Sequence, residues 1–374
     1  MCGISGILSF NNVDRTNRLN KIHSLIHHRG KDASGIVARN NNLFSDDIYF
    51  AHRRLSILDL SESSNQPLID YQNKNMIIFN GEIYNYKEIR HNLKKLNYNF
   101  ITNSDTEVLL YSYNEWGIDF IKILKGMFSI AIWDEKIKTL YCVRDEFGVK
   151  PLYYKINGQS IEFASESKAL YEKEELDPFY IQSYFLGMYS PFGTSVFKKI
   201  QSLKPGHFLK INDKKIKIEK YFDLHEEYIK RKKPKYEDFQ KINRLFNNSV
   251  KSQLISDRNV SLSLSSGNDS TSIFYSMLKN NTKFNTISIG YEKSDNYDLK
   301  QAQKISKDHG IKNYNQIISN SESFDLISKS IQALSEPVGD SSIVSTFKLS
   351  QIASSLNSPV LLSGVGGDEV FVGY

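Results

Sequence analysis

The first residues of the chain, Met1-Cys2-Gly3-Ile4, place a candidate nucleophile at its start. If the initiator methionine is removed, as a small second residue permits, Cys2 carries a thiol and a free α-amine on one carbon. A free α-amine titrates near ~7.7 to 8.0, so at neutral pH it can accept the thiol proton, directly or through a water. The thiolate that forms is the reactive state of cysteine. The alternative is a small buried residue near a chain end, and these residues alone leave both interpretations open.

Asn80-Gly81 is a second pair of residues that can do chemistry. The pair follows an apolar strand predicted over residues 76–79. In such a position Asn-Gly commonly forms a turn. At the end of a strand the same two residues can instead offer a side-chain amide and a backbone N–H as donors to a developing oxyanion.

Charged side chains at two further places suit the recognition of an amino acid. Arg53 and Arg54 lead into residues 55–58, an apolar stretch that predicts a short strand. An arginine there either presents its planar fork to a carboxylate or is solvated at the surface. Ser104 and Asp105 open a predicted helix, and either residue can serve as its N-cap. Asp105 can alternatively hold the ammonium group of a bound amino acid.

A loop of serine and glycine, residues 265–270, lies between a strand predicted over 260–264 and a helix predicted over 271–278. This order lets backbone N–H groups and serine hydroxyls converge on a phosphate at the start of the helix. The loop is not a Walker A sequence, because the Gly-Lys-Ser/Thr element is missing. A second loop, with Asp368-Glu369, follows a strand predicted over residues 359–363, and its carboxylates suit Mg²⁺.

The elements that must position these residues change in character along the chain. Strands dominate up to about residue 220, whereas strands and helices alternate after residue 236, as in a parallel sheet whose strand ends bind a nucleotide. Between them, residues 225–236 contain a basic run without apolar periodicity, which predicts a linker. We therefore expect an α/β protein with domains over residues 1–224 and 237–374.

Composition limits the class of protein. A chain of 374 residues, 40% hydrophobic and 24% charged, fits a soluble globular protein of two or three domains. Its net charge of +6 is small and calls for no nucleic-acid partner. Two cysteines, Cys2 and Cys142, are too few for a disulfide framework and fit a reducing compartment. No apolar run approaches the ~20 residues of a membrane span, so a cytoplasmic protein is expected.

Taken in order, these segments resemble the glutamine-hydrolysing asparagine synthetases over nearly the whole chain. The first domain resembles the class II, N-terminal-nucleophile glutamine amidotransferases at Met1-Cys2-Gly3-Ile4, His28-Arg29-Gly30, Arg54-Leu55-Ser56-Ile57, Asn80-Gly81-Glu82-Ile83-Tyr84-Asn85, Ser104-Asp105-Thr106-Glu107, and Arg144-Asp145 with Lys150-Pro151-Leu152-Tyr153. The second resembles the ATP-pyrophosphatase type of synthetase at residues 265–270, Glu336-Pro337, and Ser363-Gly364 with Asp368-Glu369. The resemblance implies a four-layer αββα sandwich followed by a Rossmann-like parallel α/β domain.

The resemblance also implies roles for individual residues. Cys2 would attack the side-chain amide of glutamine, with Asn80 and Gly81 as oxyanion donors. Arg54 would hold the α-carboxylate of glutamine and Asp105 its α-ammonium group, within a pocket formed by Arg54, Leu55, Ser56, Ile57, Leu58, Glu82 and Asp105. ATP and its pyrophosphate would be held by Leu264, Ser265, Ser266, Gly267, Asp269, Ser270, Ile289, Ser363 and Gly364, with Asp269 and Asp368 binding Mg²⁺. The expected partners are glutamine, ATP, aspartate or another carboxylate, and a second copy of the chain in a homodimer.

Departures from the family pattern leave the acceptor open. Ser266 and Asn268 stand where the family usually has glycine and an apolar residue, and Asn268 is expected to place an amide where the loop packs. Val365 replaces a glutamate that many members use in forming the acyl-adenylate. Members also continue beyond the position of Tyr374, so the synthetase half is expected to be incomplete. The alternatives are an amidotransferase for another carboxylate, such as a sugar acid in surface polysaccharide synthesis, and a truncated glutaminase or glutamine-binding module.

Overall fold

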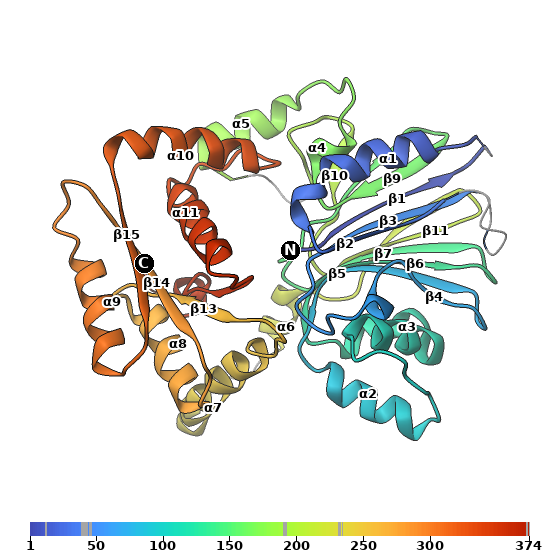
Figure 1. Ribbon diagram of the computed structural model, residues 1–374. Coiled ribbons are helices and arrows are strands. Elements are labelled where there is room, and N and C mark those ends of the chain that lie inside the picture. The colour runs from blue at the N-terminus through green and yellow to red at the C-terminus, as the bar shows by residue number, and fades with distance from the viewer. Residues whose placement is uncertain are drawn as a thin grey trace. The chain divides into compact units, whose positions relative to one another are not determined.

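The computed structural model describes residues 1–11, 13–38, 44, 47–189, 193–230, 233, 235–371 and 373. The chain divides into two compact units, drawn in Figure 1. The first consists of Met1–Lys232 with Ser335–Pro337, and the second of Lys233–Leu334 with Val338–Tyr374. In the part of the chain that the structure describes, no helix is both long and apolar enough to cross a membrane.

Two six-stranded antiparallel sheets form the centre of the first unit (Figure 1). One has the order β10-β8-β9-β1-β3-β2, with β1 at Gly3–Ser9, β2 at Ala33–Val37, β3 at Ile48–Arg54, β8 at Tyr153–Ile156, β9 at Ser160–Ala164 and β10 at Ile200–Ser202. The other has the order β12-β11-β7-β6-β5-β4, with β4 at Leu68–Asp70, β5 at Asn75–Ile83, β6 at Gly126–Asp134, β7 at Thr139–Arg144, β11 at His207–Asn212 and β12 at Lys215–Lys220.

The two sheets pack face to face because their strands are apolar on both sides. Along β1, Ile4 and Leu8 join a core shared with Ile78 of the other sheet, whereas Ile7 faces a second core beneath α1 (Thr16–Leu25). Alternation of side chains along a strand produces this division. The helix α1 and the short α4 (Ser167–Leu170) cover the first sheet, and α2 (Tyr86–Lys95) and α3 (Asp105–Trp116) cover the second (Figure 1). The predicted αββα sandwich is confirmed.

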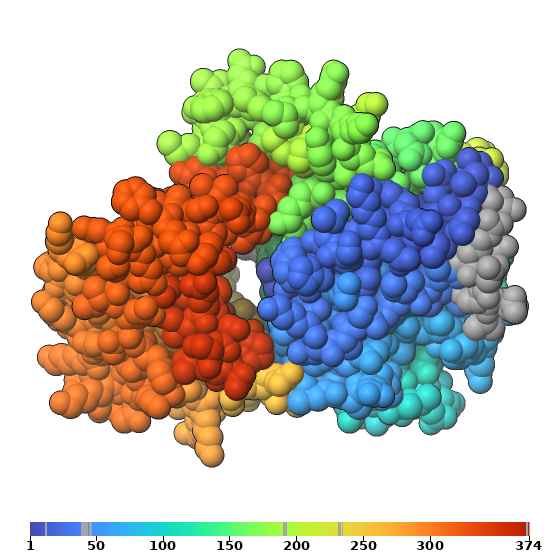
Figure 2. All heavy atoms as spheres, turned by 45° about the horizontal axis from the view of Figure 1, so that its top comes forward, coloured from blue at the N-terminus to red at the C-terminus, as the bar shows by residue number. Residues whose placement is uncertain are grey.

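The described part of the first unit contains further short helices. They are the 3₁₀ helices η1 (His27–Arg29), η2 (Glu62–Ser64) and η3 (Gly117–Ile123) and the α-helices α5 (Pro178–Gly187) and α6 (Leu224–Ile229). In Figure 2 the atoms of the N-terminal part of the chain, in blue, form part of the surface that faces the viewer.

The segment predicted as a linker is partly helical. The helix α6 begins after Asp223, whose carboxylate caps it by accepting a hydrogen bond from the His225 N–H at 2.9 Å. An N-terminal cap of this kind stabilises a short helix even without apolar periodicity, which is why the pattern missed it. Arg231, Lys232 and Pro234 of the predicted linker lie outside the described residues.

The second unit is built on a four-stranded parallel sheet with the order β15-β14-β13-β16. Its strands are β13 (Val260–Ser263), β14 (Asn285–Tyr291), β15 (Asn313–Ile318) and β16 (Val360–Leu362). Its helices are α7 (Tyr236–Gln253), α8 (Asn268–Lys279), α9 (Tyr297–Asp308), α10 (Asn320–Ala333), α11 (Ser342–Ser355) and α12 (Gly367–Phe371). Leu262 of β13 packs with Phe274 of α8 and Phe284 in its core, so the predicted parallel α/β fold is confirmed.

Candidate active site

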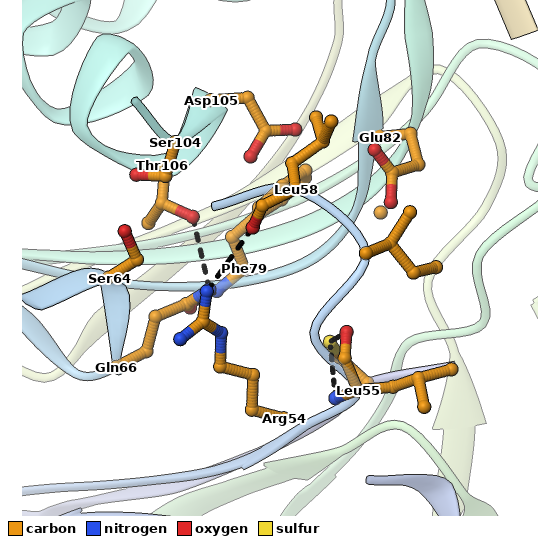
Figure 3. A pocket seen from close by; sticks show the side chains of 13 residues that line it. Arg54, Leu55, Leu58, Ser64, Gln66, Phe79, Glu82, Ser104, Asp105 and Thr106 are labelled. Carbon is orange, nitrogen blue, oxygen red and sulfur yellow. Dashed lines mark hydrogen bonds between the residues drawn. The ribbon is translucent and has the colours of Figure 1, made fainter. Parts of the chain in front are cut away.

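One pocket of the first unit brings together residues from four separate segments (Figure 3). They come from the N-terminus, the segment after β3, strand β5 and the start of α3. Its lining consists of Cys2, Arg54, Leu55, Ile57, Leu58, Ser64, Gln66, Phe79, Gly81, Glu82, Ser104, Asp105 and Thr106. Eight of these were expected from the sequence to act on glutamine, namely Cys2, Arg54, Leu55, Ile57, Leu58, Gly81, Glu82 and Asp105.

Cys2 lies directly before β1, so the sheet fixes its backbone. The Leu55 N–H donates a hydrogen bond to the Cys2 sulfur at 3.4 Å, and the Arg29 Nε donates to the Cys2 carbonyl oxygen at 2.9 Å. Burial raises the pKa of the Cys2 thiol. The resting thiol is therefore protonated at neutral pH and needs a base before it can attack.

The surroundings of the N-terminus favour a neutral amine, the form that the α-amine of Cys2 would need to act as the base once Met1 is removed. Burial, together with the positive charges of Arg29 and Lys150, lowers the pKa of the amine of Met1 to about 6. An amine with this pKa is mostly neutral at pH 7 and can accept a proton. Lys150, whose Nζ lies 3.5 Å from the Met1 sulfur, is a buried neighbour to which the sequence analysis assigned no role, although it lies in one of the family motifs.

Arg54 ends β3 and shapes the segment that follows. Its guanidinium donates to the carbonyl oxygens of Ser61 at 2.7 Å and Leu58 at 3.2 Å, and to the carbonyl oxygen of Asp59. The predicted strand over residues 55–58 is wrong, because the chain leaves the sheet at Arg54 and turns at Asp59, where φ is 49°. Ser56 does not line the pocket; its N–H donates to Asp32 at 2.8 Å.

Two carboxylates, Glu82 on β5 and Asp105 on α3, enter the same pocket. Ser104 is the N-cap of α3 and accepts from the Glu107 N–H at 3.3 Å, so the helix does not need Asp105 as its cap. Asp105 instead accepts from the Ile83 N–H at 3.1 Å. Burial raises the pKa of Asp105 to about 6 and raises that of Glu82 well above its usual value, with repulsion from Asp105 adding to the shift in Glu82. A bound ammonium group would stabilise both as anions.

Asn80-Gly81 forms neither a turn nor a strand end, because both residues lie inside β5 and pair with Ser129 and Phe128 of β6. A Cβ atom on Gly81 would lie 2.1 Å from the carbonyl oxygen of Met127, so only glycine fits there. Asn80 is 1% exposed, and its side-chain nitrogen donates to no group in the described part of the chain. A buried donor without a partner is uncommon and suits a group that binds the reacting substrate.

Several pocket residues escaped the sequence analysis. Thr106 belongs to the family motif Ser104-Asp105-Thr106-Glu107, and its position next to Asp105 could have marked it as a pocket residue. Ser64, Gln66 and Phe79 carry no local pattern that marks them as pocket residues.

Glu166, after β9, fixes the segment that holds the Cys2 backbone. Its carboxylate accepts from the Arg29 Nη1 at 3.0 Å and from the His28 Nε2 at 2.7 Å. These partners outweigh the opposing effect of burial and lower the pKa of Glu166 to about 2. Since the folded pKa lies below the ordinary value of 4.5, the stabilisation is complete above pH 4.5 and is lost as the pH falls through 2.

Glu166→Gln is therefore expected to lower the free energy of unfolding at pH 7 by roughly 2 to 3 kcal/mol. The difference from the unsubstituted chain should shrink by more than half at pH 3, because that pH lies between the unfolded and folded pKa values and most of the contribution of Glu166 is already lost there. Urea unfolding at the two pH values measures this difference in the free energy of unfolding. The matched control is Glu175→Gln, a substitution of an exposed glutamate. An equal difference at both values would contradict the assignment.

The loop after β13 in the second unit is organised by its serines. The hydroxyls of Ser265 and Ser270 are hydrogen-bonded at 2.9 Å, and the Gly267 N–H donates to the Ser265 hydroxyl at 3.2 Å. The helix α8 begins at Asn268, three residues before the predicted start, with Gly267 as its N-cap. Its first-turn N–H groups therefore follow the loop directly, as anion binding requires.

Asn268 and Ser266, which depart from the family pattern, both have side chains that the structure places without disturbing the loop. Asn268 is exposed in the first turn of α8, so the expectation that it packs an amide beneath the loop is wrong, since the earlier helix start turns this position outward. The hydroxyl of Ser266 donates to the carboxylate of Asp298, near the start of α9.

The predicted nucleotide residues gather near the carboxyl ends of neighbouring parallel strands. Leu264 and Ser363 directly follow β13 and β16, which pair, and Ile289 lies in β14. The side chain of Asp269 packs against Gly364 and Gly367; a Cβ atom on Gly367 would lie 2.1 Å from an Asp269 oxygen. The residue next to Gly367 is Asp368, in α12.

Asp269, in α8, and Asp368, in α12, are the candidate ligands for Mg²⁺. Among the described residues no group of three or more His, Cys, Asp or Glu side chains forms a cage for a metal ion. Mg²⁺ commonly needs only one or two carboxylates, because waters and the phosphates of the substrate complete its coordination. Asp269 and Asp368, beside a phosphate-type loop, are a donor set of that kind.

Two protein-family models match successive parts of this chain. The family model of the glutamine amidotransferase domain matches residues 1–222, and that of asparagine synthase matches residues 241–374. A solved glutamine phosphoribosylpyrophosphate amidotransferase from B. subtilis aligns with 84% of this chain and 65% of that one, at 18% identity and a TM-score of 0.45, which is too low to establish a shared fold.

Relatives match over the entire chain. A putative glutamine-hydrolysing asparagine synthetase of Methanocaldococcus jannaschii is 34% identical, with 100% of this chain and 76% of that protein aligned. A glutamine-hydrolysing asparagine synthetase of Bacillus subtilis is 31% identical, with 100% of this chain and 59% of that protein aligned. The chain thus spans between about three fifths and three quarters of these two relatives. It belongs to the family of glutamine-hydrolysing asparagine synthetases.

Proposed function

We propose that the chain catalyses ATP-dependent, glutamine-hydrolysing amide synthesis, with glutamine cleaved in the pocket of the first unit. The observation that carries the proposal is the content of that pocket. It combines the Cys2 thiol, a pair of carboxylates suited to an ammonium group, and Gly81. Asn80 precedes Gly81 in β5 and does not line the pocket, but its buried amide nitrogen has no partner among the described residues.

Glutamine hydrolysis would proceed once Met1 is removed. The α-amine of Cys2 takes the thiol proton, and the sulfur attacks the side-chain amide carbon of glutamine. The Asn80 amide and the Gly81 N–H stabilise the oxyanion that forms. The carbon–nitrogen bond then breaks, the proton passes to the leaving nitrogen, and ammonia departs from a γ-glutamyl thioester. Water hydrolyses this thioester to glutamate and restores the thiol.

Substrate orientation follows from the charges around Cys2. Asp105 and Glu82 hold the α-ammonium group of glutamine, which relieves the repulsion between these two buried acids. Arg54 would favour the α-carboxylate through its positive charge and through the segment 55–58 that it shapes, because its terminal nitrogens already donate to the carbonyl oxygens of Leu58, Asp59 and Ser61 and to the Asn65 side chain. The three charged side chains fix the amino acid at its α-carbon, so that only the side-chain amide reaches Cys2.

The second unit would use ATP to activate a carboxylate. The loop 265–270 and the start of α8 receive the pyrophosphate portion, while Leu264, Ile289, Ser363 and Gly364 hold the nucleotide. Asp269 and Asp368 hold Mg²⁺, which neutralises phosphate charge when bound. The acceptor we propose is aspartate, which would give asparagine, AMP and pyrophosphate.

Release of pyrophosphate and AMP from ATP tests this function and its acceptor together. With glutamine present, both products are expected with aspartate and not without it. Asp269→Asn should abolish their release but leave glutamine hydrolysis intact, whereas Asp308→Asn, an exposed acid at the end of α9, should change neither. Products that appear only with another carboxylate, such as a uronic acid, would overturn aspartate. Glutamate release without ATP cleavage under any condition would overturn the synthetase part.

A further inference from the structure

The strand that carries the two oxyanion donors is incompletely paired. β5 pairs with β6 along its whole length, from Asn75 to Ile83, but pairs with β4 only from Asn75 to Ile77. Backbone N–H and C=O groups of a strand point alternately to its two sides. Beyond Ile77, the groups of β5 that point away from β6 therefore have no strand partner in the described part of the chain.

Side chains replace the missing strand at Phe79. The Phe79 N–H donates to the Gln66 Oε1 at 2.6 Å, and the His52 Nε2 donates to the Phe79 carbonyl oxygen at 3.1 Å. Gln66 in turn donates to the Thr106 hydroxyl at 3.1 Å, which connects β5 with α3 (Figure 3). His52 is fully buried and Gln66 is 7% exposed, so water does not compete effectively for these hydrogen bonds.

Gly81 lies between two residues of β5 whose N–H groups are held by side chains on the side away from β6. The N–H of Ile83, two residues after Gly81, donates to Asp105, and the N–H of Phe79, two residues before it, donates to Gln66. The Gly81 N–H points to the same open side, and Gly81 lines the pocket with Cys2. The direction of this N–H therefore depends on how firmly the strand is held at Phe79 and Ile83.

His52 is suited to a permanent donor role. Burial lowers the pKa of His52 to about 3, so the ring is neutral at neutral pH. A carbonyl oxygen can only accept, so the ring proton must lie on Nε2. The other ring nitrogen has no hydrogen-bond partner among the described residues, which is compatible with this tautomer.

We propose that His52 and Gln66 are positioning residues for the oxyanion donors, and that they act by holding Phe79, the residue directly before Asn80. The inference rests on the proposed hydrolysis of glutamine. Neither residue is required to touch the reacting amide. Loss of either anchor lets the backbone at residues 79–81 rotate, and small misplacement of donors reduces catalysis by up to about a hundredfold.

The test measures glutamate release from glutamine by the full chain. His52→Leu keeps the volume but removes the donor, and His52→Gln restores an N–H at a similar reach. We expect His52→Leu to lower kcat by about tenfold to a hundredfold, with KM for glutamine within about twofold of wild type. His52→Gln should recover kcat to within about threefold. The matched control is Ile78→Val, a fully buried side chain of the same strand, which should leave kcat unchanged.

A second variant keeps the proposal testable if His52→Leu does not fold. Gln66→Met removes the acceptor for Phe79 and should give the same fall in kcat with the same KM. In a Cys2→Ala background, which cannot turn over, Gln66→Met and His52→Leu should leave the dissociation constant of glutamine unchanged. Unaltered kcat in the folded variants, weakened glutamine binding, or a fall in kcat that His52→Gln does not reverse would overturn the proposal. If the wild-type chain itself releases no glutamate, the proposed function fails instead.

Discussion

Cys2→Ala is expected to abolish glutamine hydrolysis, with at least about a thousandfold loss of glutamate release. Among the described residues that line the pocket, Cys2 alone carries a thiol that can form the thioester, and the substitution leaves the oxyanion donors and the carboxylates in place. Synthesis driven by added ammonia should persist, because ammonia then reaches the acceptor without the first reaction. Glutamate release measures the first effect, and ammonia-dependent pyrophosphate release measures the second.

Cys142→Ala is the matched control, because Cys142 is the other cysteine of the chain. It is fully buried in β7, where burial raises the pKa of its thiol, and it belongs to the core between the sheets. A thiol in such surroundings is inert, so its removal should leave the hydrolysis rate near wild type. Persistent glutaminase activity in Cys2→Ala would remove Cys2 from the proposed role.

Retention of Met1 is expected to block hydrolysis by at least about a hundredfold, although the Cys2 thiol remains present. A peptide bond to Met1 converts the nitrogen of Cys2 into an amide, which cannot take the thiol proton. The amine of Met1 has its pKa lowered to about 6, yet it sits one residue further from the sulfur along the chain. The Met1 side chain also occupies the neighbourhood of Lys150.

Chain prepared with Met1 intact, verified by mass spectrometry, should gain activity when methionine aminopeptidase removes that residue. The Cys2→Ala chain treated in the same way is the control and should stay inactive. Equal activity before and after removal would count against the α-amine as the base and would require another proton acceptor near Cys2.

Much of the fold followed from local patterns. The strands β13 and β16 and the start of the helix α3 were predicted to within about one residue of their observed positions, because each is marked by its own apolar residues or cap. The order of motifs likewise indicated the family, since several independent segments had to match together. A local pattern of this kind needs no information from the rest of the chain.

The environment of the candidate site depended on contacts between distant segments. Asn80-Gly81 resembled a turn in sequence, yet pairing with β6 holds it inside a strand. The stretch after Arg54 resembled a strand, yet the guanidinium of Arg54 binds its carbonyl oxygens and draws it into a loop. Strand pairing and hydrogen bonds from a side chain to a distant backbone cannot be predicted from a local sequence pattern, because each joins residues that are separated in sequence.

The sequence by itself determined the chemistry that is available: a thiol beside a chain end, two acids, an Asn-Gly pair and a serine loop before a helix. Only the tertiary structure decided their state and their neighbours. Burial raises the pKa values of Cys2, Asp105 and Glu82. Because β4 ends before it reaches Phe79, the backbone of Phe79 forms its hydrogen bonds with the side chains of His52 and Gln66 instead. The physical reason is that desolvation and hydrogen-bond geometry arise from packing between segments, whereas residue type and spacing are already present in the unfolded chain.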